Sequence, residues 1–464
     1  MANFNPAQLE EQVKSGQLWT AAERIRTCKE ALQDNPDEPT TLYHLSLAYL
    51  EQMQPQHAIE IQKKMAAINH DAPRTKLILA LCQQQMHEDA QCEATLRDCL
   101  AANLDDPEVL EVLAARCIED QDIAQAQQHL RKILDSDPNR ANARAQLAVT
   151  YLMTNDIAAA DSELTRAVDS PYPSLEAAEK LALLETHISC DTAEADKIYQ
   201  KLIDKGQRED VILAMTAGFY TAASALEPTP NTAVPQLPAW LNKAHDILQN
   251  AIAKFPDSPV LHCLMARWYA TAYQRAGMNL DAAASYVHNA EVYVERTLER
   301  DPCYFDARCT AANNRLFHGR MKIDTLEKIL TDGIELHPHM SLFYTELARL
   351  YLEYREPGRR EPDKAEEICR KLLSLDPRCC AGHMLLGRSY RKLGRMEESL
   401  ASLMHAIELD PTHIEATIET AITQYKTGDL DAAAASLDKA RRLNRRGVFK
   451  NMIDNYQREI DEQR

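Results

Sequence analysis

A pattern of turn residues and prolines returns about every 34 residues along this chain of 464 residues. It is clearest between residues 380 and 411. The marked positions there are Leu386, Gly387, Tyr390, Gly394, Ser399, Leu403, Ala406, Asp410 and Pro411. A fixed period of this length predicts a repeated helix-turn-helix unit. Each such unit packs only on its neighbours, so that one core runs along the whole array.

The residue types at the marked positions are those that two packed helices joined by a turn require. Gly387 allows the first helix to approach its neighbour closely, and Gly394 makes the turn. Ser399, Leu403 and Ala406 are spaced four and then three residues apart, which places them in a stripe on one buried face of the second helix. Pro411 ends that helix and starts the next unit.

These residues and their spacing resemble the tetratricopeptide repeat (TPR) superfamily. The resemblance extends along most of the chain, with some degenerate units, and points to no particular member. It implies an all-α fold, a right-handed TPR superhelix (α-solenoid) of about twelve helix-turn-helix repeats with a C-terminal capping helix.

A proline-rich segment, residues 226–239, interrupts the seventh unit. We expect an inserted loop there, with a contact loop or a flexible point as the alternative, because such a segment cannot be helical. It separates an acidic N-terminal array (1–225) from an Arg-rich C-terminal array (240–445). Residues 446–464 are expected to form the capping helix.

Composition argues against several classes of protein. A net charge of -18 disfavours nucleic-acid binding, which depends on phosphate contacts. No apolar run is long enough to cross a membrane, and the N-terminal residues lack the features of a secretory signal. The 12 cysteines include no C-x-x-C pair, and several, such as Cys369, fall at buried repeat positions. Free buried thiols predict a reducing, cytoplasmic location.

The sequence predicts no catalytic residue, no metal and no cofactor, and therefore a protein that is not an enzyme. It has no P-loop, G-x-S-x-G, H-E-x-x-H or Gly-rich dinucleotide turn. His337 and His339 lie in an inter-repeat turn without further ligands. Cys379, Cys380 and His383 also lack the spacing of a zinc site.

Candidate binding residues come from the first helix of each unit, which lines the concave groove in TPR-like arrays. In the eighth, tenth and eleventh units an Arg follows the small Gly or Ala. Guanidinium groups suit bidentate capture of a carboxylate or phosphate. The alternative is that each Arg pairs with a carboxylate of a neighbouring helix. The candidates in this C-terminal groove are Arg267, Asn313, Arg315, Arg349, Arg388, Arg391 and Lys392.

The N-terminal groove differs, because the corresponding positions are apolar or aromatic. Tyr43, His44 and Leu47 are the candidates there. A partner protein or peptide with an apolar segment and an acidic segment would match both grooves.

The sequence therefore predicts a non-catalytic protein-protein interaction scaffold or adaptor that binds a partner segment in its concave groove. One alternative is a constitutive structural subunit of a larger multiprotein assembly, or one that associates with its own copy. A second is a peptide-sensing regulator whose superhelix changes pitch at segment 226–239. The Lys/Asn clamp of chaperone co-factors is absent from the clear repeats.

Overall fold

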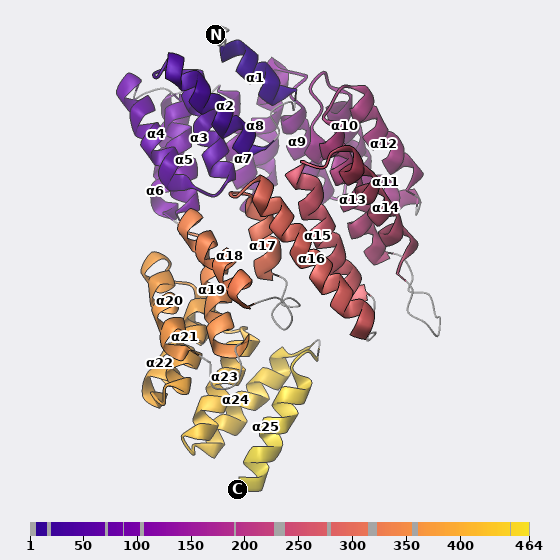
Figure 1. Ribbon diagram of the computed structural model, residues 1–464. Coiled ribbons are helices and arrows are strands. Elements are labelled where there is room, and N and C mark those ends of the chain that lie inside the picture. The colour runs from indigo at the N-terminus through magenta and orange to yellow at the C-terminus, as the bar shows by residue number, and fades with distance from the viewer. Residues whose placement is uncertain are drawn as a thin grey trace. The chain divides into compact units, whose positions relative to one another are not determined.

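The computed structural model describes residues 6–15, 20–69, 73–86, 88–102, 106–189, 192–226, 237–275, 280–313, 323–354, 361–445 and 447–463. Over these residues the chain is helical and contains no strand (Figure 1). The prediction of an all-α solenoid is confirmed. None of the described helices is both long and apolar enough to cross a membrane.

The chain forms two compact units, Met1–Ala307 and Arg308–Arg464. The first contains α1 (Pro6–Lys14), α2 (Ala21–Asp34), α3 (Pro39–Glu51), α4 (Pro55–Ile68), α5 (Pro73–Gln85), α6 (Asp89–Ala102), α7 (Pro107–Glu119), α8 (Ile123–Ser136), α9 (Ala141–Met153), α10 (Ile157–Asp169), α11 (Leu175–Ser189), α12 (Ala193–Asp204), α13 (Glu209–Ala223), η1 (Ser224–Leu226), α14 (Ala239–Lys254), α15 (Pro259–Arg275) and α16 (Leu280–Arg300).

Helix α17 (Phe305–Asn313) begins at the end of the first unit and continues into the second. The second unit continues with α18 (Ile323–Leu336), α19 (Ser341–Arg349), the short π-helical turn η3 (Leu350–Tyr354), α20 (Pro362–Leu375), α21 (Cys380–Lys392), α22 (Met396–Leu409), α23 (Ile414–Lys426), α24 (Leu430–Leu443) and α25 (Lys450–Gln463). In the described part of the chain, α1 to α24 follow as twelve pairs, and α25 comes last, as expected of a capping helix.

The unit formed by α21 and α22 shows how the repeat sequence produces the helix pair. Gly394 has a φ of 81°, a left-handed conformation that Gly adopts at little cost, and it ends α21. A Cβ on Gly387 would lie 2.6 Å from Leu403 Cγ, so only Gly allows the two helices to approach this closely. Leu403 and its stripe neighbours Ser399 and Ala406 are fully buried. The predicted roles of these residues are confirmed.

The recurring Asp-Pro pair also has a local role, because the Asp side chain closes the turn between repeats. In each case the carboxylate accepts a hydrogen bond from the backbone N–H two residues later. These bonds join Asp137 to Asn139 (3.1 Å), Asp301 to Cys303 (3.0 Å), Asp376 to Arg378 (3.0 Å) and Asp410 to Thr412 (2.9 Å).

Several predicted features lie outside the described residues. They include the candidate Arg315 and most of segment 226–239, of which only Leu226 and residues 237–239 are described. The compact units divide at residue 307, and the predicted division of the array at 226–239 stays a prediction.

The cysteines of the described residues are free, and most are buried. Burial raises the pKa of Cys28 and of Cys82 from 9.0 to about 12, and that of Cys99 to about 11. We expect iodoacetamide at pH 8 to label these three thiols about a hundredfold or more slowly in the folded chain than in the chain unfolded in guanidinium, because only thiolate reacts.

The measurement is mass spectrometry of each cysteine peptide after timed labelling, with the unfolded chain as the control. Because the folded pKa is raised, these thiols favour folding fully below pH 9, and this contribution is lost as pH rises towards 12. Equal labelling of the folded and unfolded chains would contradict the burial of these thiols.

Candidate functional site

The arginines predicted for the C-terminal groove lie on α19 and α21, within the second unit. Arg349 donates from Nη2 to Glu415 Oε2 at 3.1 Å. Arg388 pairs with Glu353, and its Nε lies 3.1 Å from Glu419 Oε1. Arg391 also pairs with Glu419. The structure therefore brings Arg388 and Arg391 together at one carboxylate, while Arg349 pairs with Glu415 on the same helix, α23.

These arginines are largely withdrawn from solvent. The side chains of Arg349, Arg388 and Arg391 are 9%, 15% and 8% exposed. Burial lowers the pKa of Arg388, but the carboxylates of Glu419 and Glu353 outweigh burial, so that its pKa lies above the usual value. This is the arrangement of the alternative interpretation, in which each Arg pairs within the protein. A partner carboxylate would have to replace one of these glutamates.

The other predicted residues of this group differ in their surroundings. Arg267, on α15 in the first unit, is exposed, and in the described part of the chain it has no carboxylate within ion-pair distance. Its charge acts on the nearby Tyr304, whose pKa is raised mainly by burial. Asn313, at the end of α17, and Lys392, at the end of α21, are both exposed.

The predicted N-terminal candidates lie on α3. Tyr43 is only 4% exposed, and the guanidinium carbon of Arg74 lies 4.9 Å from its ring centroid. Arg74 also donates to Glu108 at 3.0 Å. His44 contacts the Tyr43 ring edge-on, and Leu47 is half-buried. Tyr43 on α3 thus packs against the Arg74–Glu108 ion pair, which links α5 to α7. The repeat pattern did not indicate this contact.

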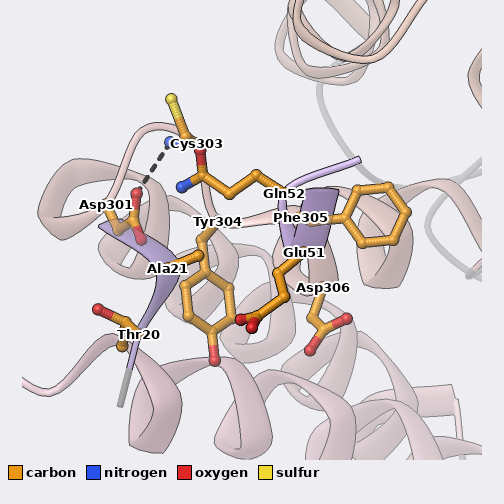
Figure 2. A pocket seen from close by; sticks show the side chains of 9 residues that line it. All are labelled: Thr20, Ala21, Glu51, Gln52, Asp301, Cys303, Tyr304, Phe305 and Asp306. Carbon is orange, nitrogen blue, oxygen red and sulfur yellow. Dashed lines mark hydrogen bonds between the residues drawn. The ribbon is translucent and has the colours of Figure 1, made fainter. Parts of the chain in front are cut away.

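A pocket of about 190 Å³ lies within the first unit, between two segments far apart in the sequence. Figure 2 shows side chains from the two segments facing one another. Glu51, Asp301 and Asp306 supply carboxylates, and Tyr304 and Phe305 supply rings. The complete lining is Thr20, Ala21, Glu51, Gln52, Asp301, Cys303, Tyr304, Phe305 and Asp306. Arg24 pairs with Glu51 at the edge of this group, and burial lowers the pKa of Arg24.

Two stretches of the sequence, residues 118–183 and 382–413, match family models described as tetratricopeptide repeat. The chain therefore contains tetratricopeptide repeats in these two stretches. This agrees with the paired helices and with the tight contact of Gly387 and Leu403. No curated protein gives a significant match to the sequence of this TPR protein.

Solved structures similar to this TPR protein include one described as human IFIT1 dimer with PPP-AAAA, with 15% identity and a TM-score of 0.33 over 87% of this chain and 94% of that one. TTC0263, a thermophilic TPR protein of Thermus thermophilus, has 24% identity and a TM-score of 0.30, over 38% and 91%. YrrB, described as a TPR protein with an unusual peptide-binding site, has 15% identity and a TM-score of 0.31, over 46% and 97%.

The described residues of the TPR array contain no group of three or more His, Cys, Asp or Glu side chains placed to hold a metal ion. What the arrangement offers is recognition chemistry. It comprises an exposed cation at Arg267, an internally paired Arg–Glu network on α19, α21 and α23, and an acidic, aromatic pocket.

Proposed function

We propose that this TPR protein is a non-catalytic interaction scaffold that binds a segment of a partner protein in the concave groove expected of its array. TPR repeats support a role in protein interaction in general. The observation that carries the specific proposal is the exposed guanidinium of Arg267 on a first helix, α15, while the other described arginines predicted for the groove have carboxylates of their own.

Arg267 suits a carboxylate of the partner, because a guanidinium donates two parallel hydrogen bonds to such a group. In this proposal the partner carries an acidic segment and places it on α15. The largely buried free thiols support a reducing, cytoplasmic compartment.

Arg267→Glu is expected to weaken capture of the partner by about tenfold, because it replaces a charge-assisted hydrogen bond by repulsion. The measurement is affinity capture with the tagged full-length chain from its own cells, followed by quantitative mass spectrometry. Arg26→Glu is the matched control, since Arg26 is also exposed and has no ion-pair partner among the described residues. A partner retained equally by both variants would refute a role for Arg267.

A second candidate function, a constitutive structural subunit, is favoured by exposed apolar side chains at neighbouring helix ends in the first unit. Met153 at the end of α9 is 47% exposed, Ile157 at the start of α10 is 38% exposed, and Ile188 near the end of α11 is 60% exposed. Apolar side chains gathered at one edge suit a protein interface. In that case Ile188→Asp removes the captured partner, and Arg267→Glu does not.

A further inference from the structure

In the first unit, side chains near the N-terminus contact turns that come much later in the chain. Tyr172 Oη donates to the carboxylate of Glu11 at 3.0 and 3.1 Å, across 161 residues of sequence. Arg208 Nη1 donates to both carboxylate oxygens of Glu23 at 2.8 Å, across 185 residues. The pocket of Figure 2 lies between residues 20–21 and 51–52 on one side and residues 301–306 on the other. Together, the Tyr172–Glu11 bond, the Arg208–Glu23 bond and the two sides of the pocket form a seam within the first unit.

The position of each partner in its repeat explains what the seam joins. Thr20 precedes α2 and Gln52 follows α3, so both lie at turns within a repeat. Arg208 precedes α13 and Asp301 precedes α17, so both lie at turns between repeats. The two kinds of turn lie on opposite edges of a helix-pair solenoid, because successive helices are antiparallel. A contact between them therefore joins one superhelical turn to the next along the axis.

The Arg208 side chain is held in place by hydrogen bonds on both sides of the seam. Its Nε and Nη2 donate to the two carboxylate oxygens of Asp210 at 3.1 and 2.9 Å, while Nη1 remains directed at Glu23. Ser258 in turn donates to Asp210 at 2.8 Å, and the Asp210 side chain is 9% exposed. Asp210 binds the guanidinium directly and Ser258 binds Asp210, so the orientation of the guanidinium does not depend on Glu23.

Glu23 is equally constrained on the other side of the seam. It accepts a hydrogen bond from the backbone N–H of Thr20 at 3.0 Å, and its own N–H donates to Thr20 Oγ1 at 3.1 Å. This capping box fixes the start of α2. Both partners are therefore ordered independently of the bond between them, and forming that bond costs little side-chain entropy.

The seam differs from the hydrophobic core shared by successive repeats, which is apolar and buried. The side chains of Arg208 and Glu23 are 26% and 29% exposed, and Thr20, which caps the helix that carries Glu23, lines the pocket. Contacts that are polar and partly exposed separate at lower free energy than a buried apolar core.

We propose that Arg208 is the latch of a seam that opens without unfolding the repeats on either side. With the latch closed, the axial contact fixes the superhelical pitch of the first unit. With the latch open, the turns that hold Thr20 and Gln52 separate from the turn at residues 301–306. This inference goes beyond the proposed function, because it does not depend on what the groove binds.

Hydrogen–deuterium exchange of the full-length chain, read by mass spectrometry, tests the latch. In Arg208→Glu, amides of peptides covering residues 50–54 and 301–308 are expected to exchange about tenfold faster, because the charge reversal removes the bond to Glu23 and adds repulsion. These peptides do not contain the substituted residue. Faster exchange there therefore reports separation across the seam.

Arg140→Glu is the matched control. Arg140 pairs with Glu111 at 2.5 Å, with side chains 27% and 16% exposed, but this pair joins adjacent repeats. Its loss should affect only peptides near residues 107–119 and 138–145.

The proposal is overturned if Arg208→Glu leaves exchange at residues 50–54 and 301–308 unchanged, or if Arg140→Glu accelerates it equally. Circular dichroism shows whether Arg208→Glu retains its helices. If it does not, Glu23→Gln takes its place, because the amide keeps the bond to Thr20 and loses only the charge. Unchanged exchange at 301–308 in Glu23→Gln would then overturn the latch.

Discussion

Gly387→Ala is expected to lower the free energy of unfolding of the second unit by about 2 kcal/mol, the usual cost of overpacking a core. The added Cβ would lie 2.6 Å from Leu403 Cγ, 3.0 Å from Leu403 Cδ2 and 3.0 Å from the backbone oxygen of Ser399. The gain in helix propensity, about 1 kcal/mol, opposes this cost but does not remove it. Urea unfolding followed by circular dichroism measures the change.

Leu403→Ala tests whether the clash with Leu403 is the cause of the expected cost of Gly387→Ala. Leu403 is fully buried, and Leu403→Ala alone should cost about 2–5 kcal/mol through the cavity that it leaves. In that background the Cβ at position 387 no longer meets the Leu403 side chain, so Gly387→Ala should become neutral or stabilising. An equal cost in both backgrounds would show that the Ser399 oxygen, and not Leu403, sets the limit.

Gly218→Ala is the control for this pair. Gly218 lies inside α13, and a Cβ there would meet only Leu264 Cδ1, at an ordinary 3.9 Å. The substitution should therefore stabilise the chain by up to about 1 kcal/mol through helix propensity. The two glycines share a helical backbone and differ in the space around them, so the contrast isolates the effect of packing.

The sequence was sufficient for the features that repeat along the chain. The Gly387–Leu403 contact and the buried stripe of α22 follow from local spacing, since residues three and four apart share a helix face. The Gly394 turn and the Asp410 turn are also set by residues within a few positions. Repetition of these short-range rules in every unit specifies the paired helices without knowledge of the superhelix.

The partners of the predicted arginines could not be read from the sequence. Glu353, Glu415 and Glu419 lie 35, 66 and 28 residues from the arginines that they contact. Many carboxylates occupy comparable positions on the first helices, and rotamers decide which of them meets which guanidinium. The repeat pattern thus located Arg349, Arg388 and Arg391 on the correct helices and left open whether they face a partner or one another.

The seam was beyond sequence reasoning for a different reason. Whether Glu23 meets Arg208 depends on the superhelical pitch of the first unit, which is the sum of a small rotation at each successive repeat. Long or irregular repeats, such as α15 with α16, change that sum. A charge pattern separated by 185 residues carries no signal of its own until the pitch is known.

The second large effect is expected at Glu419, which neutralises both Arg388 and Arg391. Its side chain is 11% exposed, and theirs are 15% and 8% exposed. Glu419→Gln keeps the shape and removes the charge, which leaves two arginines in a low-dielectric site without this counter-ion. Breaking a buried pair in this way costs about 3–5 kcal/mol, so the urea midpoint of the second unit should fall strongly.

Asp438→Asn is the matched control in the same unit. Asp438 accepts from Arg441 at 2.7 Å, but the two side chains are 63% and 46% exposed, and such a pair contributes about 0–1 kcal/mol. Equal destabilisation by Glu419→Gln and Asp438→Asn would show that the Arg–Glu network is solvated and contributes little.

Glu419→Gln also separates the two interpretations of the arginines, because it removes the carboxylate with which a partner would compete. If the network binds an acidic segment, the variant should bind that segment more tightly than the parent chain does, even though it is less stable. Isothermal titration with the captured partner measures both chains below the unfolding transition. If the network only supports the fold, affinity stays unchanged while stability falls, and Arg388 and Arg391 then contribute to packing between α21 and α23 and not to recognition.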